Sequence, residues 1–315
     1  MSEEISVVKC HSAEEWLNEL SPLSTRFRRS TGPTDWIFRG HADASWPLLP
    51  TAFRPKSWGF IEPIWLKMTE RDQRIAEQDV LRDFFHRCDV AGLALPEDSA
   101  RTRRLLLDVF DPMSVLEHQD ELWPPLELWS LAALAQHYGV PTRMLDWTYS
   151  AWTAAYFAVV NVVGRVDPTG EVGVWCYSVP DHLFQTWLER NIGGGSGEVH
   201  LVTTPYAGNP NLRAQRGVHM LYAGIRPMDG PAHRPTFDLE LRRIGSQVPD
   251  SLLLFTVPAG EATRAMGLLA SAGISAATLF PGYAGVVQAM HESETRSNAI
   301  AASVHDLFPK RLESS

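Results

Sequence analysis

Cysteine is scarce in this chain, which has three in 315 residues. Cys10, Cys88 and Cys176 are widely spaced and do not form a CxxC pair. Disulfide-rich scaffolds and zinc ribbons need closely and regularly spaced cysteines, so the sequence argues against both classes. The composition, with 44% hydrophobic and 21% charged residues, is that of an ordinary globular protein.

Long hydrophobic runs are also missing. The longest, residues 151–163, is too short to cross a bilayer and contains Asn161. The N-terminal residues Met1-Ser2-Glu3-Glu4 are acidic, and the apolar stretch of a secretory signal does not follow them. We therefore expect a cytoplasmic protein that does not associate with membranes.

The chain has a deficit of positive charge, with a formal net charge of -9 and a pI of about 5.7. Nonspecific binding to DNA or RNA requires a basic surface that releases counterions, so we do not expect it. Two arginine clusters, at positions 26, 28 and 29 and at positions 101, 103 and 104, could form local basic patches. The interpretation that we favour for both clusters is a solvated helix or loop face.

The common enzyme signatures are absent. There is no HExxH, no GxSxG and no protein-kinase motif set, and no GxGxxG follows a predicted strand. The glycine-rich run at 193–197 lacks the lysine of a phosphate-binding loop and is typical of a linker. No cluster of metal ligands is evident, so we predict no metal site. A doubly wound nucleotide-binding fold is disfavoured.

Hydrophobic periodicity and turn residues predict an α+β fold, with helices dominating the first half of the chain and strands the second. The strand that begins at Trp36 is expected to join the later sheet. The predicted strands are 36–40, 142–146, 171–179, 200–204, 217–222, 252–257 and 278–281. The predicted helices are 13–20, 70–86, 101–110, 126–137, 151–160, 261–271 and one from 282 onward.

Two segments place Arg, His and Asp in strongly apolar and aromatic surroundings. The first, residues 36–41, reads WIFRGH, and the second, residues 136–148, reads QHYGVPTRMLDWT. An unpaired buried charge is very costly, so each arginine there needs a fixed anionic partner. The two segments therefore indicate one polar site in an apolar cleft.

Side-chain alternation restricts the partner of Asp146. On a strand, Thr142, Met144 and Asp146 share one face and Arg143 lies on the other. We therefore pair Asp146 with Arg39 or with a bound ligand, and the alternative is that Asp146 caps the helix that starts near Ser150. An Arg39–Asp146 ion pair could equally be a purely structural link.

The two segments resemble the signatures of the FRG domain, a family named for a Phe-Arg-Gly motif. The motif is Phe38-Arg39-Gly40 here, and residues 136–148 match the second, longer signature. Residues 211–218, NLRAQRGV, resemble a further family segment, although His219 stands where an aromatic residue is expected. The resemblance covers residues 13–292, and we interpret residues 1–315 as a single FRG-type domain with a helical insert at 61–135.

The resemblance implies similarity to the ADP-ribosyltransferase fold, whose core is a split antiparallel sheet that binds NAD. It implies that Arg39 and Gln215 are catalytic. It also implies a set of NAD-binding residues: Arg39, His137, Tyr138, Thr142, Arg143, Asp146 and Thr148. Packing at a helix end is the structural alternative for His137 and Tyr138, and loop anchoring is the alternative for Gln215.

The expected function is transfer of ADP-ribose from NAD to a macromolecular target, in a bacterial toxin or a phage-defence effector, as the resemblance implies. The transition state of such a transfer carries positive charge on the ribose, which a carboxylate stabilises best. Gln215 carries no charge, and Glu171 and Glu198 are candidate substitutes. The alternative is a noncatalytic module that binds a nucleotide or a peptide in the same cleft.

Overall fold

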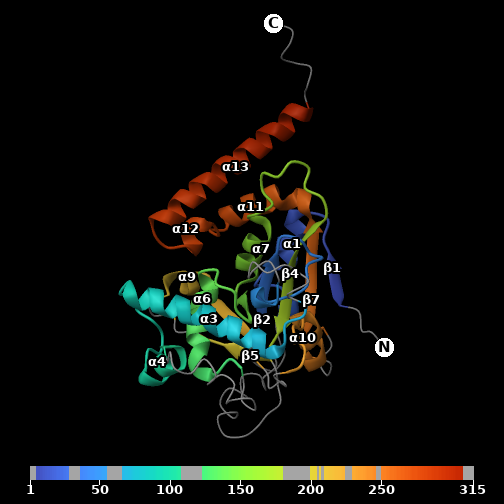
Figure 1. Cartoon of the computed structure of the whole chain (residues 1–315). Helices are drawn as coiled ribbons and strands as arrows, with labels where there is room; N and C mark the ends of the chain where they lie inside the picture. The colour runs from blue at the N-terminus through green and yellow to red at the C-terminus, as the bar shows by residue number, and fades with distance from the viewer. Residues whose placement is uncertain are drawn as a thin grey trace.

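The computed structural model describes residues 5–27, 36–54, 66–107, 123–179, 199–203, 206, 209–223, 229–245 and 250–307. Its described strands form one sheet of seven strands in the order β1-β7-β4-β2-β3-β6-β5 (Figure 1). β1 and β7 are parallel and every other described pair is antiparallel. The strands are β1 (Ser6–Lys9), β2 (Trp36–His41), β3 (Met144–Thr148), β4 (Glu171–Ser178), β5 (Val199–Val202), β6 (Gly217–Tyr222) and β7 (Leu252–Pro258).

The described helices lie mainly in three parts of the chain: between β2 and β3, directly after β3, and after β7 (Figure 1). They are α1 (Ala13–Glu19), α3 (Glu70–Val90), α4 (Ala100–Leu107), α6 (Trp129–His137), α7 (Ala151–Val159), α9 (Pro210–Ala214), α10 (Phe237–Gly245), α11 (Ala262–Ser271), α12 (Ala276–Leu279) and α13 (Tyr283–Leu307). The mixed α+β class that the sequence predicts is confirmed. None of the described helices is both long and apolar enough to cross a membrane.

Two hydrophobic layers enclose the sheet. Helices α1, α7 and α11 pack on one face around Trp16, Tyr156 and Phe255. Residues of α10 and of the segment after β2 pack on the other face, around Phe53 and Phe237. A third cluster joins α3 and α6 to the β3–β6–β5 end of the sheet.

The sheet is nearly divided between β2 and β3. Phe38 and Thr148 are the one residue pair that links these two strands in the described structure, whereas β2 and β4 pair over six residues. Gly40 lies on the face that α7 covers, and a Cβ atom there would come within 2.0 Å of the carbonyl oxygen of Ala154. The glycine of the 36–41 motif is therefore needed for the close approach of α7 to β2.

Two strand predictions are wrong in part or whole. The segment predicted at 142–146 forms its strand two residues later, at Met144–Thr148. The segment predicted as a strand at 278–281 instead contains the end of α12, with Phe280 as its C-cap. Ser275 is the N-cap of this helix, and its backbone N–H donates to the hydroxyl of Thr278 at 3.1 Å.

Candidate functional site

A pocket of about 310 Å³ opens on the sheet face that α7 covers, beside the division between β2 and β3. Alternate residues of a strand share a face, so Asp146 and Thr148 point to the same side as Phe38. His137 at the end of α6 and Phe157 of α7 both line the pocket. The complete lining is Phe38, Arg39, Gly40, His137, Asp146, Trp147, Thr148, Ala154, Phe157, Leu212, Gln215, Gly217, Val218, His219 and Phe280.

Arg39 bridges the division in the sheet. Its Nη1 donates a 2.7 Å hydrogen bond to the main-chain carbonyl of Asp146, and its Nε donates to Nε2 of His41 at 3.2 Å. Arg39 and Asp146 are therefore in contact as expected, but not through the carboxylate. The guanidinium donates to the main-chain oxygen of Asp146. Nη2 of Arg39 makes no hydrogen bond with any described residue.

His41 supports Arg39 as a neutral acceptor. Its side chain is buried, and burial together with the neighbouring charge of Arg39 lowers the pKa of His41 to about 3. The imidazole is therefore uncharged near neutral pH. Since Nε2 accepts the hydrogen bond from Arg39, the ring proton lies on Nδ1.

Asp146 presents an ionised carboxylate to the pocket. Nε2 of His219 lies 3.3 Å from one carboxylate oxygen, and Nε2 of Gln136 donates to the other at 3.2 Å. Half of the side-chain surface is exposed, toward the pocket. Burial by the surrounding protein raises the pKa of Asp146, but the hydrogen bond from His219 and the charge of Arg39 outweigh it. The pKa therefore lies well below its usual value.

Thr142 and Thr148 serve this arrangement in different ways. Thr142 is buried outside the pocket, and its hydroxyl donates to Oε1 of Gln136 at 2.7 Å, which orients the amide that holds Asp146. Thr148 lines the pocket, but its hydroxyl proton is used in a 2.6 Å bond to the carbonyl of Gln215. Thr142 therefore acts indirectly, by orienting Gln136. The hydroxyl of Thr148 can accept a further hydrogen bond but has no proton left to donate.

Gln215 lines the pocket but is tied to a neighbouring segment. Its Nε2 donates to the carbonyl of Leu279 at 3.2 Å, which joins the turn before β6 to α12. This is the loop anchoring that the sequence left open. Of the two carboxylates considered as substitutes for Gln215, Glu171 lies at the start of β4 and does not line the pocket, and Glu198 lies outside the described residues.

His137 and Tyr138, at the end of α6, differ in their relation to the pocket. His137 lines the pocket, and burial lowers its pKa, with the Asp146 carboxylate opposing that shift. The side chain of Tyr138 is 67% exposed and packs edge-on against the His137 ring, with ring centroids 5.3 Å apart. Tyr138 is thus beside the pocket and not in its wall.

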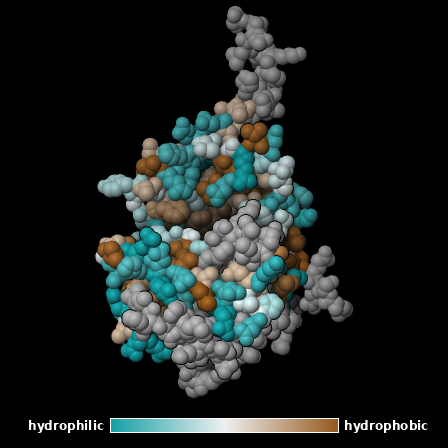
Figure 2. All heavy atoms as spheres, in the orientation of Figure 1, coloured by the Kyte–Doolittle hydropathy of each residue, from teal (hydrophilic) through white to brown (hydrophobic). Residues whose placement is uncertain are grey.

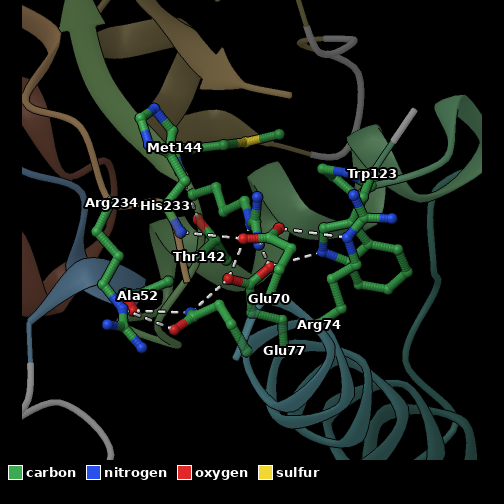
Figure 3. A network of polar contacts seen from close by, with 12 residues as sticks. Ala52, Glu70, Arg74, Glu77, Trp123, Thr142, Met144, His233 and Arg234 are labelled. Carbon is green, nitrogen blue, oxygen red and sulfur yellow. Dashed lines mark hydrogen bonds and ion pairs between the residues drawn. The ribbon is translucent and has the colours of Figure 1, made fainter. Parts of the chain in front are cut away.

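Arg143, expected to bind NAD, lies away from the pocket in a buried ionic network. Its Nη2 donates to Glu70 at 2.9 Å and its Nε to Glu77 at 2.6 Å, and all three side chains are at most 6% exposed. Figure 3 shows both carboxylates projecting from α3 toward this network, with Arg74 and Trp123 beside them. The guanidinium has two fixed anionic partners, so we correct its role to a structural one.

Two residues of the site, His219 and Gln136, were not predicted as site residues from the sequence. His219 faces Asp146 across the β3–β6 pair, a relation that depends on strand register. Gln136 was included in the motif without a role. The one available signal was that His219 replaces the aromatic residue expected there. In the described part of the chain, no group of three or more His, Cys, Asp or Glu side chains could hold a metal ion.

Comparison with known proteins agrees with the motifs. No curated protein and no solved structure matches this chain. The family model of the FRG domain matches residues 34–163, which include Arg39, Asp146 and the helices between them. The chain therefore carries an FRG domain in residues 34–163.

Proposed function

We propose that the pocket binds NAD and that the protein transfers ADP-ribose from it to a macromolecular target. The observation that carries this proposal is the ionised Asp146 carboxylate on the pocket wall, held by His219 and Gln136. Cleavage of a glycosidic bond places positive charge on the ribose, and a fixed carboxylate stabilises that charge. Asp146 takes the role that an uncharged Gln215 could not fill.

The other groups of the pocket suit the remainder of such a substrate. The free Nη2 of Arg39 can donate to a phosphate or a ribose hydroxyl, for which a planar guanidinium is well shaped. Phe157 and Phe280 meet edge to face, with centroids 6.2 Å apart, and offer an apolar wall for a flat ring. The volume of about 310 Å³ is at the lower end for small-molecule sites, so we assign one half of the dinucleotide to the pocket.

The proposed reaction breaks the bond between the ribose C1′ and the nicotinamide nitrogen, and the electron pair leaves with nicotinamide. A nucleophilic N or O atom of the target forms the new bond to C1′ and gives up its proton. His137 is the base that we assign to this proton, because burial keeps its imidazole neutral. Asp146 remains ionised throughout and acts through its charge.

The near-division of the sheet supports the resemblance to the ADP-ribosyltransferase fold. Arg39 lies where β2 leaves β3, and the pocket with Asp146 opens at the same place. A role as a toxin or a phage-defence effector rests on the family resemblance alone. Growth arrest on expression of the wild type, but not of an inactive variant, is the result expected for such an effector.

The test is calorimetric titration of the purified protein with NAD, together with chromatographic detection of released nicotinamide. We expect binding and release by the wild type, and loss of both in Arg39→Ala, with a thermal unfolding scan to confirm that this variant is folded. Binding without release, even when cell extract supplies acceptors, would favour the noncatalytic module. Absence of both in folded wild-type protein would refute the proposal.

A further inference from the structure

Five exposed residues lie close to lining residues of the pocket, in sequence or through a contact, and we call them the rim: Tyr138, Tyr206, Arg213, Arg216 and Tyr283. Each is fixed close to a lining residue. Tyr138 packs on His137, and Arg213 and Arg216 flank Gln215. The hydroxyl of Tyr206 donates to the carbonyl of Gly217 at 3.2 Å.

Tyr283 is included in the rim because it directly follows the short segment that joins α12 to α13. It begins α13 three residues after the lining residue Phe280, and its side chain is 93% exposed. Gln215 donates to Leu279 and so brings this segment against the turn that carries both arginines. Figure 2 shows apolar side chains gathered in a recessed band beneath α13.

The rim is locally basic although the chain carries a net charge of -9. The three segments that supply most of it, residues 136–141, 209–217 and 278–285, contain no Asp or Glu. Arg213 and Arg216 are exposed, and neither forms an ion pair with a described residue. By contrast, Arg103 forms ion pairs with Asp89 and Asp98.

Exposed arginines and exposed aromatic rings around one opening are the elements that bind single-stranded nucleic acid. Guanidinium groups contact successive phosphates, and aromatic rings stack on unpaired bases irrespective of sequence. A basic peptide would find no carboxylate on these rim segments, and an acidic peptide would leave the tyrosine rings unused. Because the contacts are confined to the rim, they are compatible with the lack of a broadly basic surface.

We propose that the rim binds single-stranded DNA or RNA, and that this strand is the acceptor of the ADP-ribose. The inference rests on the transfer proposed above and names its target. A nucleic-acid strand that crosses the rim passes over the pocket opening beside His137. An unstacked base can there present an N or O atom to the ribose.

Binding is measured by fluorescence anisotropy, with labelled mixed-sequence single-stranded DNA and RNA titrated over a range of salt concentrations. The test variant combines Arg213→Gln with Arg216→Asn, because Arg216 has a φ of 50° and Asn tolerates that conformation. Each phosphate contact on a single strand contributes about 0.7 to the slope of log K against log salt, so the slope should fall by about 1.4. Tyr138→Ala and Tyr283→Ala should each weaken binding about fivefold or more at unchanged slope.

The matched control is Arg165→Gln, which removes one exposed arginine from the loop after α7, away from the lining residues. It should bind like the wild type. Absence of strand binding by the wild type would overturn the inference, as would undiminished binding by the double arginine variant. Displacement of the oligonucleotide by a glutamate-rich peptide of the same net charge would also overturn the inference.

Nicotinamide release is followed on the same preparations, both without any oligonucleotide, when water is the acceptor, and after the oligonucleotide is added. Release into water does not require the rim. The double arginine variant should retain this release, and Asp146→Asn should lose it while still binding the strand. Binding of the oligonucleotide with no nicotinamide release, either into water or with the oligonucleotide present, would therefore reject the NAD chemistry but not the assignment of the binding surface. Mass spectrometry should show ADP-ribose added to the strand, and release with an unmodified strand would reject the acceptor.

Discussion

Replacing Arg143 by Met should destabilise the protein without altering the pocket directly. The substitution keeps an unbranched side chain of similar length but leaves Glu70 and Glu77 buried without their shared cation. Removing one partner of a buried ionic pair costs about 3–5 kcal/mol. With an unfolding entropy of about 2.1 cal/mol/K per residue over 315 residues, this corresponds to a fall in Tm of roughly 5–8 °C.

The destabilisation should depend on pH. Burial raises the pKa of Glu70, but the charge of Arg143 and its hydrogen bond outweigh burial and hold that pKa below its ordinary value. In the wild type, Glu70 therefore adds stability above its unfolded pKa, which is lost as pH falls through the folded pKa. In Arg143→Met, Arg74 is the cation that remains beside Glu70, so the folded pKa of Glu70 rises and its protonation costs the folded state less. The stability difference should be largest near pH 7 and shrink toward pH 4.5.

The assay is thermal and urea unfolding of wild type and variant at several pH values, combined with NAD titration below the unfolding transition. Arg87→Met is the matched control, because Arg87 lies on α3 in an exposed pair with Asp83 that should contribute at most about 1 kcal/mol. A normal Tm in Arg143→Met together with lost NAD binding would refute the structural role and restore the original assignment.

Two further predictions concern β2. Gly40→Ala should destabilise the fold by more than the usual ~1–3 kcal/mol of overpacking, because its Cβ would meet the Ala154 carbonyl at 2.0 Å; Gly260→Ala, which meets no atom within 4 Å, should leave the Tm unchanged. The ring signals of His41 in NMR spectra should not titrate between pH 5 and 8, since its pKa is lowered to about 3. The neutral form favours folding, so His41 adds stability above about pH 6.5 that is lost as pH falls toward 3. A titration midpoint near 6.5 would contradict its role as a neutral acceptor for Arg39.

Local patterns predicted the parts of the fold that depend on near neighbours in sequence. The alternating segment before Ser178 forms β4, and the predicted strand at 217–222 is β6. The strand at Trp36 joins the later sheet, between β4 and β3, as expected. The short apolar run at Thr278 was misassigned because such runs fit a strand and a buried helix equally well.

The buried face of α3 shows why other features could not be predicted. Leu81 and Phe85 are buried, as helical periodicity predicts, but Glu70, Gln73, Arg74 and Glu77 are buried as well. Charged residues at these positions normally indicate a solvated face. Their burial depends on Arg143, which is 66 residues from Glu77 in sequence, so only the tertiary structure brings the partners together.

Some features of the candidate site could likewise be predicted from the sequence, and others could not. Arg39, His137, Asp146, Thr148 and Gln215 lie around one pocket, as the motifs suggested. The partner of the carboxylate was not predictable, since it depends on the register that places β6 opposite β3. The motif residues Thr142 and Arg143 precede β3, and both are directed into supporting contacts outside the pocket.

The most direct test of the central claim is the rate of nicotinamide release from NAD by wild type, Asp146→Asn and Glu171→Gln. Asn keeps the shape of the side chain but removes the charge, and Glu171 is a carboxylate outside the pocket. The account predicts equal rates for wild type and Glu171→Gln, and a rate at least about 10²-fold lower for folded Asp146→Asn, the usual loss for one electrostatic group. Undiminished release by Asp146→Asn would contradict it.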